Sequence, residues 1–257
     1  MAHDADGTQF TVLGTVDEVD RAELVDRYAY PDSRWVRANM IASADGGATS
    51  AGTSGGLGGA GDKALFSVLR ELADVVLVGA ATVRAEDYSG VSLTAGQRAH
   101  RESRGQAAVP PIAVLTRSGA VDPDAALFQR TEVPPIVFTS ASVAPQTQRT
   151  LGGLAEVIDA SGQDPDSLDL ARALGVLTDR GLGRVLAEGG PGILGRLIAD
   201  GLLDELCLTV APILVGGAAG RIVTGDGDSR TGLRLQHALS DGDGYLFLRY
   251  ARAGTNR

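Results

Sequence analysis

Residues 184–196 constrain the fold of this 257-residue chain more than any other stretch. An apolar run there ends in Glu188, four glycines follow at positions 189, 190, 192 and 195, and a helical pattern begins among them. A strand that enters a glycine-rich turn and then a helix presents bare backbone N–H groups and the positive end of a helix dipole to an anion. The segment therefore predicts an α/β unit whose turn cradles a phosphate beside a functional carboxylate.

The turn also fits the pattern G-x-G-x-x-G, with Gly190, Gly192 and Gly195 as its glycines. The pattern alone is weak, because residues 56–61 match it too, without a strand immediately before them. An acidic residue about 20 positions further on, which would bind a ribose hydroxyl, is missing. The sequence therefore argues against a standard dinucleotide-binding Rossmann site, and it leaves a plain tight turn as the alternative to a phosphate cradle.

Charge and composition exclude several function classes. The net charge of −9 argues against a nucleic-acid or membrane-surface binder, because both need basic patches. Cys207, the single cysteine, suits a reducing cytoplasm and rules out a thiolate metal cluster, and no histidines are paired at helical spacing, so we expect no metal. No apolar run reaches the ~20 residues of a membrane span.

The order of apolar runs predicts an α/β protein with a mixed, mostly parallel central sheet, flanking helices and a C-terminal antiparallel edge hairpin. Helices are expected at 17–28, at 168–178 and at 193–199, and a further helix is expected to begin after Asp62, which would serve as its cap. Strands are expected at 35–42, 75–79, 112–115, 136–138, 157–158, 184–188 and 206–214, with 245–250 as an edge strand.

The domain organisation predicted from these runs is simple. Residues 1–34 form an N-terminal arm, 35–252 a single domain, and 253–257 a C-terminal tail. The polar segment 88–109 indicates a long loop or short exposed helix near the site, or a solvated insertion.

Several residues have both a functional and a structural interpretation. Asp45 stands at a strand exit but also begins an Asp-Gly turn. Arg70 could clamp a substrate phosphate or lie as a solvated flank of its helix. Thr116, Arg117 and Ser118 suit a 2′-phosphate, although such strand ends are commonly solvated turns. Residues 52–56 match the hydrolase pattern G-x-S-x-G, but they lack the flanking strand and helix that this nucleophile requires.

Taken together, five segments resemble the pyrimidine reductase family of riboflavin biosynthesis, whose domain also forms the C-terminal half of bifunctional deaminase–reductases. They are Ala42-Ser43-x-Asp45-Gly46, Ser54, Leu69-Arg70-x-x-x-Asp74, Val78-Gly79-x-x-Thr82-Val83-Arg84-Ala85 and Glu188-Gly189-Gly190. The resemblance implies a dihydrofolate-reductase-like fold, a homodimer, and the activity of a 5-amino-6-(5-phosphoribosylamino)uracil reductase with NADPH as cofactor.

The resemblance also implies residue roles. Catalysis would involve Asp45 and Glu188, which could orient the sugar or stabilise a cationic imine. Substrate would contact Asn39, Ser54, Arg70 and Glu188. NADPH would contact residues on four loops and the following helix: Ala42, Gly56, Gly79, Thr82, Glu86, Thr116, Arg117, Ser118, Gly189, Gly190, Pro191, Gly192, Ile193, Leu194, Gly195 and Arg196.

The chain departs from the family pattern mainly where substrate would bind. Asn39 stands in place of a common lysine, Tyr88 follows Glu86-Asp87 without the usual proline, and Gly90 and Leu93 replace an expected leucine and arginine. These departures leave open reduction of a pterin or folate, and also a cofactor-binding protein without catalysis.

Overall fold

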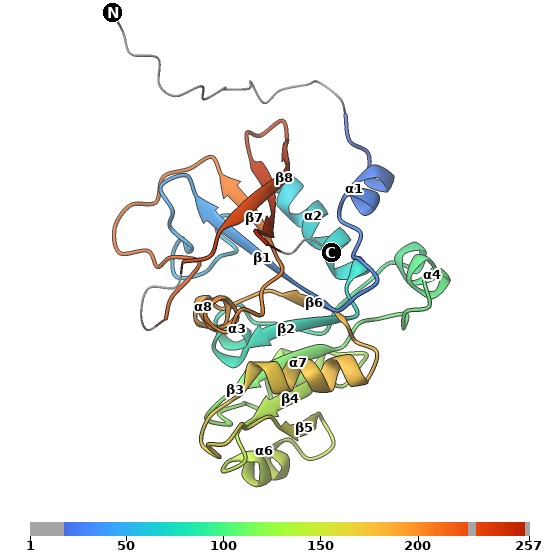
Figure 1. Ribbon diagram of the computed structural model, residues 1–257, viewed down its shortest axis with the longest axis vertical. Coiled ribbons are helices and arrows are strands. Elements are labelled where there is room, and N and C mark those ends of the chain that lie inside the picture. Colours follow the sequence, from blue (N-terminus) through green and yellow to red (C-terminus); the bar gives the residue numbers. More distant parts are fainter. Residues whose placement is uncertain (1–17, 226–229, 255–257) are drawn as a thin grey trace, which may run out of the picture.

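The computed structural model describes residues 18–225 and 230–254. Its core is one nine-stranded sheet in the order β5-β4-β3-β2-β6-β1-β7-β9-β8 (Figure 1). Seven neighbouring strands run parallel, and β9 and β8 pair antiparallel at one end. The strands are β1 (Trp35–Ser43), β2 (Val75–Gly79), β3 (Ile112–Thr116), β4 (Ile136–Thr139), β5 (Glu156–Asp159), β6 (Arg184–Ala187), β7 (Glu205–Ala211), β8 (Leu233–Ser240) and β9 (Leu246–Arg252).

Helices cover both faces of the parallel strands. The helices are α1 (Arg21–Arg27), α2 (Ala60–Leu72), α3 (Ala80–Ala85), α4 (Ala95–Ser103), α5 (Ala126–Gln129), α6 (Ala144–Leu151), α7 (Leu170–Asp179) and α8 (Pro191–Ala199). Along β2, Val76 and Val78 belong to the core under α2, whereas Val75 and Leu77 belong to the core under α7 and α8. Burial on both faces explains why this strand is an unbroken apolar run.

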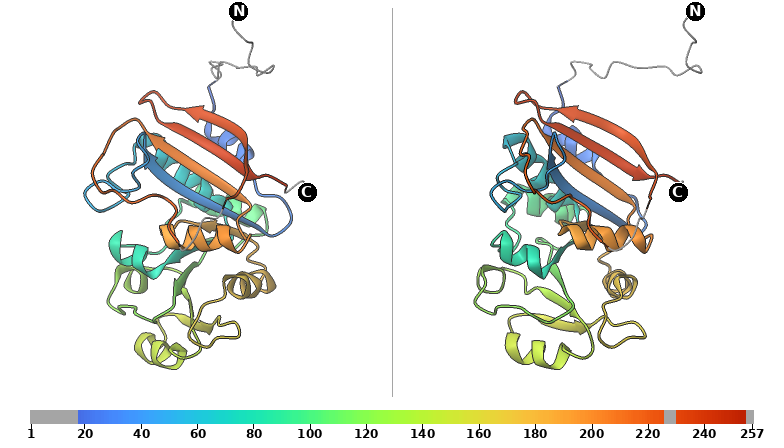
Figure 2. Two further views of the ribbon diagram at one scale, coloured as in Figure 1. Left: turned by 60° about the vertical axis from the view of Figure 1, so that its left-hand side comes forward. Right: turned by 90° about the vertical axis from the view of Figure 1, so that its left-hand side faces the viewer.

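The predicted α/β class with a C-terminal antiparallel hairpin is confirmed, but one strand assignment is wrong. The segment expected to be the edge strand is β9, which lies between β7 and β8, and the edge of the sheet is β8 (Figure 2). Strand β8 was not predicted at all. The helix expected from residue 17 begins at Arg21 after its cap Asp20, and residue 17 itself lies outside the described residues.

The polar segment 88–109 contains α4, and part of that helix is buried. Arg101 is fully buried and donates to the carbonyl oxygens of Glu71 at 2.8 Å and Ala73 at 2.5 Å. Glu71 lies in the last turn of α2, and Ala73 is its C-cap. Arg101 also donates to the carbonyl of Ala107 at 2.8 Å. The guanidinium therefore satisfies carbonyl groups that the end of a helix leaves unpaired, and a purely solvated insertion is excluded.

A buried ion cluster joins the N-terminal arm to the C-terminal strands. Glu205 on β7 accepts from Arg37 Nε at 2.5 Å and from Arg249 Nε and Nη2 at 3.0 and 2.9 Å. Burial alone would raise the pKa of Glu205, but the two guanidinium groups lower it to about 2. Tyr28 packs edge-on against His237 of β8 with ring centroids 4.9 Å apart, so the arm contacts the edge strand.

Candidate active site

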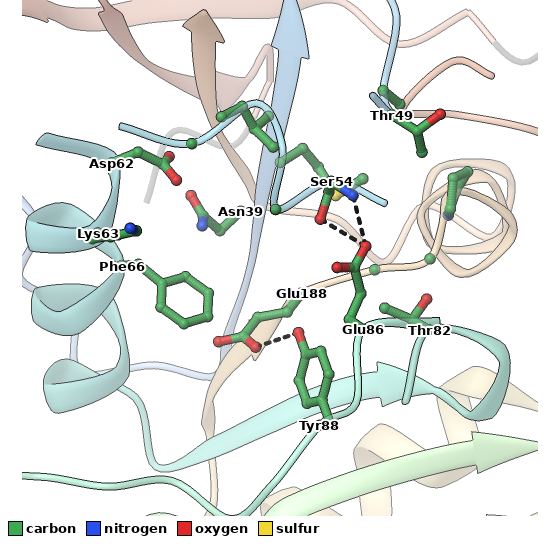
Figure 3. A pocket seen from close by; sticks show the side chains of 18 of the residues that line it. Asn39, Thr49, Ser54, Asp62, Lys63, Phe66, Thr82, Glu86, Tyr88 and Glu188 are labelled. Atoms are coloured by element: carbon green, nitrogen blue, oxygen red, sulfur yellow. Dashed lines mark hydrogen bonds between the residues drawn. The ribbon is translucent and has the colours of Figure 1, made fainter. Parts of the chain in front are cut away.

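A cavity of about 460 Å³ opens where β1 and β6 end, beside α2 and α3. Parallel strands of an α/β sheet gather ligands at their carboxyl ends, and here β6 has returned to lie between β1 and β2. The predicted site residues that line the cavity are Asn39, Ser54, Arg70, Thr82, Glu86, Glu188, Gly189, Gly190 and Pro191. Figure 3 labels five of them, Asn39, Ser54, Thr82, Glu86 and Glu188. The structure therefore brings together residues up to 152 positions apart (from 39 to 191).

Glu188 is the hydrogen-bonding centre of one wall. Arg70 donates to both of its carboxylate oxygens, from Nε and from Nη2, each at 2.7 Å. The Tyr88 hydroxyl donates to Oε2 at 2.8 Å, as Figure 3 shows. Arg70 also stacks over the Phe66 ring, 4.2 Å from its centroid. A bidentate guanidinium and a phenol thus hold the carboxylate in one orientation before any ligand binds.

Electrostatics fix the protonation states around Glu188. Burial raises the pKa of Tyr88, and the negative charge of Glu188 raises it further, so the phenol keeps its proton at neutral pH. Burial alone would lower the pKa of Arg70, but the adjacent carboxylate more than offsets this and raises it. The wall therefore carries a charged guanidinium and a protonated phenol.

Ser54 and Glu86 form a second contact across the cavity. Glu86 Oε1 accepts from the Ser54 backbone N–H at 2.8 Å and from the Ser54 hydroxyl at 2.9 Å. Glu86 caps the C-terminal end of α3, so this pair attaches the loop before α2 to the loop after α3. Both residues were predicted for the site, Ser54 toward substrate and Glu86 toward cofactor, and the structure places them in direct contact.

The glycine turn between β6 and α8 needs glycine at two positions, at Gly189 for its backbone conformation and at Gly190 for its close approach to Thr82. Gly189 has φ of +106°, which side-chain-bearing residues rarely adopt. A Cβ at Gly190 would lie 2.6 Å from Thr82 Oγ1. Gly190 is also the N-cap of α8 and has no side chain to satisfy the first N–H groups of the helix.

The later residues of the turn lie outside the cavity lining, so their contacts with NADPH stay a prediction. Gly195 is a glycine for packing, because a Cβ there would lie 2.0 Å from the Thr224 carbonyl oxygen. Leu194 is buried, and Arg196 lies near the Leu168 carbonyl at 3.4 Å and Asp200 at 3.5 Å. None of Gly192, Ile193, Leu194, Gly195 or Arg196 lines the cavity, although Ile193 packs within 3.2 Å of a Cβ built on Gly79.

Asp45, a predicted catalytic residue, does not line the cavity. Its carboxylate accepts from the Ser43 hydroxyl and from the backbone N–H groups of Val215 at 3.1 Å and Gly216 at 2.7 Å. These hydrogen bonds lower the pKa of Asp45 to about 2, and the hydrogen bond from Ser43 contributes most. In this structure Asp45 anchors the loop after β7, and its catalytic role stays a prediction.

The remaining predicted cofactor residues lie near the cavity but outside its lining. Ala42 is buried near the end of β1. Gly56 packs against Ser50, because a Cβ built on Gly56 would lie 3.2 Å from the Ser50 Cβ. Thr116 is buried at the end of β3, and Arg117 and Ser118 are exposed in the loop that follows. Since β3 neighbours β2, these three residues share the edge of the sheet that carries the cavity.

The cavity-lining residues that sequence reasoning missed include Asp62, Lys63, Phe66 and Tyr88. Asp62, Phe66 and Arg70 recur every four residues, which places them on one face of α2. This spacing was a usable signal. Asp62 was instead expected to cap α2, but the N-cap is Gly59, and Asp62 lies in the first turn. Within the described residues, no group of three or more acidic, histidine or cysteine side chains could hold a metal.

Comparison with known proteins agrees with this geometry. The family described as RibD C-terminal domain matches residues 34–247, which include every cavity-lining residue. The chain belongs to this family.

Three known proteins are similar to this chain over most of their own length. A 2,5-diamino-6-ribosylamino-4(3H)-pyrimidinone 5′-phosphate reductase from Methanothermobacter thermautotrophicus is 30% identical over 75% of this chain and 85% of its own. A crystal structure of a pyrimidine reductase-like protein from Corynebacterium diphtheriae superposes with a TM-score of 0.76 at 30% identity, over 85% of this chain and 92% of the other. The riboflavin biosynthesis reductase of Saccharomyces cerevisiae, 17% identical over 86% of this chain and 90% of its own, shares the fold with a TM-score of 0.61.

Proposed function

We propose that this protein is an NADPH-dependent reductase that converts the ribosyl group of a ribosylaminopyrimidine phosphate into a ribityl chain. The observation that carries the proposal is the Arg70–Glu188–Tyr88 network, which lies next to the glycine turn in one cavity. Family membership supports the same activity, because the archaeal relative is named as a reductase of this substrate class.

The glycine turn fits the pyrophosphate of a dinucleotide. Gly190 leaves the N-terminus of α8 without a side-chain cap, and a Cβ at Gly192 would have no atom closer than 3.9 Å. Open space at an uncapped helix N-terminus suits an anion. We assign pyrophosphate binding to residues 189–192 with Thr82, and the 2′-phosphate to Arg117 with Thr116 or Ser118. When bound, the cofactor supplies a hydride.

The residues around Glu188 fit the proton transfer that the reaction needs in addition to the hydride. Reduction of a ribosylamino group adds a hydride at the carbon next to nitrogen and a proton at the ring oxygen, which opens the sugar. Tyr88 holds a proton on its hydroxyl, and a departing alkoxide is a stronger base than a phenolate, so this proton can transfer to the ring oxygen. Arg70 lies beside Tyr88 to stabilise the resulting phenolate. Glu188 and Ser54 orient the sugar hydroxyls.

Asp45 supports this site indirectly in our account. Its hydrogen bonds to Val215 and Gly216 connect the loop after β1 to the loop after β7. Residues 35–252 form the single reductase domain that we propose, and the cytoplasm is the compartment that we infer for it. No helix in the described ranges is long and apolar enough to cross a membrane.

We further propose that the protein is a homodimer. Leu233, Leu235 and Leu246 are 39%, 41% and 44% exposed, which is unusual for leucines of a sheet. Leu246 and Tyr250 lie on one face of β9, and Leu235 of β8 stands opposite Tyr250, so these side chains share one apolar sheet face. A second copy that covers this face would remove its apolar surface from water.

Turnover of two substrates tests the proposed function. Purified protein with NADPH and a ribosylaminopyrimidine phosphate should oxidise the cofactor and form a ribitylamino product. Dihydrofolate in the same assay tests the pterin alternative, which predicts faster oxidation with that substrate. Tight NADPH binding with no oxidation on either substrate would instead indicate a binding protein without catalysis.

A further inference from the structure

One end of the cavity, at the first turn of α2, carries polar groups that the proposed proton chemistry leaves unused. Asp62 and Asn39 line this end, and in Figure 3 their side chains point toward one another. A Cβ at Gly58 would lie 2.8 Å from Asp62 Oδ2, so the glycine leaves room for the carboxylate. The Asn39 side-chain oxygen is buried and makes no hydrogen bond within the protein.

The surroundings of Asp62 stabilise its carboxylate only in part. Burial raises the pKa of Asp62, and the Thr209 hydroxyl and the Lys63 ammonium offset only part of this shift. A partly desolvated carboxylate beside the unpaired Asn39 side-chain oxygen is stabilised by a ligand that brings N–H donors.

The two ring types of this substrate class differ at one edge. A 2-aminopyrimidin-4-one presents two adjacent donors, the 2-amino N–H and the ring N3–H, which match the two oxygens of a carboxylate. A uracil ring presents a carbonyl oxygen in place of the amino group. That oxygen would face a carboxylate oxygen, and because both atoms are acceptors they cannot form a hydrogen bond. Loss of one donor against a charged acceptor changes discrimination by about 10-fold or more.

We propose that Asp62 is the residue that selects a 2-aminopyrimidin-4-one ring over a uracil ring in this enzyme. The inference rests on the proposed function and goes further, because it assigns ring recognition to a residue outside the motifs shared with the family. Phe66, one turn after Asp62 on the same face of α2, provides an apolar surface for the ring. A pterin carries the same donor edge, so the shared chemistry is the 2-amino-4-oxo edge.

The experiment compares kcat/KM for three substrates in the intact protein. They are the 2,5-diamino-6-ribosylaminopyrimidinone phosphate, the corresponding 5-amino-uracil phosphate, and dihydrofolate. The wild-type protein should prefer the 2-amino pyrimidinone over the uracil by about 10-fold or more. Asp62→Asn should lose at least about 10-fold on the 2-amino substrate and none on the uracil, because an amide can donate to the carbonyl that replaces the amino group.

Controls separate the outcomes. Asp179→Asn makes the same change on the exposed end of α7 and should leave both pyrimidine activities unchanged. Equal thermal midpoints for Asp62→Asn and wild type exclude a folding defect. A wild type that uses uracil equally well, or an Asp62→Asn that lowers both activities alike, would overturn the inference. If NADPH is not oxidised with any of the three substrates, the proposed function is overturned instead. A preference for dihydrofolate would support recognition of the 2-amino-4-oxo edge by Asp62 but would identify the substrate as a pterin.

Discussion

Glu188 organises the site at the scale of single residues. Its two oxygens receive three hydrogen bonds, two from Arg70 and one from Tyr88, so the carboxylate cannot rotate freely. Arg70 is itself held by stacking on Phe66. If a sugar hydroxyl binds Glu188 as we propose, a carboxylate held in this way loses little further conformational freedom, which lowers the cost of positioning the substrate.

Tyr88→Phe tests the proton donor. The variant keeps the ring but removes the hydroxyl that donates to Glu188, so we expect kcat to fall by about 100-fold, the lower end for general acid catalysis, with unchanged NADPH affinity. Steady-state kinetics and calorimetric titration with NADPH measure the two quantities. Tyr250→Phe removes a hydroxyl from β9, away from the cavity, and serves as the matched control. A loss in NADPH affinity as large as the loss in kcat would assign Tyr88 to the cofactor.

The sequence could predict Glu188 and Arg70 but not how the site is completed. Both stand in local motifs, one after an apolar strand and one on a helical stripe. Tyr88 was missed because its position depends on the path of the chain after α3, which no local pattern specifies. Asp45 stands at the predicted strand exit, but backbone groups 170 residues away take up its carboxylate, and only tertiary structure determines such a contact.

At the scale of elements, the glycines after β6 have separate purposes. Gly189 provides a backbone conformation, Gly190 a close approach to Thr82, and Gly195 a close approach to the backbone at Thr224. Gly192 meets neither requirement, since a Cβ built on it would have no atom closer than 3.9 Å. The pattern G-x-G-x-x-G thus combines folding requirements with one position that is free to serve a ligand.

Two substitutions separate these purposes. Gly192→Asp should leave the fold intact, because its Cβ meets no atom within 3.9 Å, but should weaken NADPH binding by about 10-fold or more through repulsion of the pyrophosphate. Gly195→Ala should lower the free energy of unfolding by about 1–3 kcal/mol, because its Cβ would clash with a carbonyl oxygen. Calorimetry and urea unfolding measure both variants. Unchanged NADPH affinity in Gly192→Asp would refute the phosphate cradle.

The hairpin β8–β9 gives a pH prediction through His237. Burial and nearby guanidinium groups lower the pKa of His237 from 6.5 to about 4. Between these values the unfolded chain binds the proton and the folded chain does not, so the free energy of unfolding should fall as the pH drops from about 6.5 toward 4. Urea unfolding across this range should show a smaller fall for His237→Phe than for wild type. Equal falls would place the acid sensitivity elsewhere.

The predictability of elements follows from how each one is buried. Strand β2 was predicted at its full length because both of its faces are covered and its sequence is continuously apolar. Strand β8 was missed because it is a half-exposed edge with Gln236 and His237 at a bulge, which breaks the alternation. Helix α4 is polar because its buried face carries Arg101 and Gln97, which bind backbone carbonyls rather than an apolar core.

At the scale of the whole molecule, we predict a dimer through the face of β8 and β9. Leu235→Glu would place a charge in that interface, so we expect the variant to be monomeric with a folded spectrum. Light scattering of wild type and variant measures the change in mass. Lys63→Glu introduces the same side chain on α2, outside this face, and should remain dimeric. A monomeric wild type would contradict the proposed assembly.

Isotope transfer tests whether the protein reduces the ribosyl carbon with a hydride from the cofactor. NADPH that carries deuterium at the transferable position should be incubated with the protein and the 2,5-diamino-6-ribosylaminopyrimidinone phosphate. The account predicts a ribitylamino product that carries one deuterium on the carbon next to nitrogen, detected by mass spectrometry, with one cofactor oxidised per product. Product without deuterium at that carbon, or cofactor oxidation without a ribityl product, would contradict it.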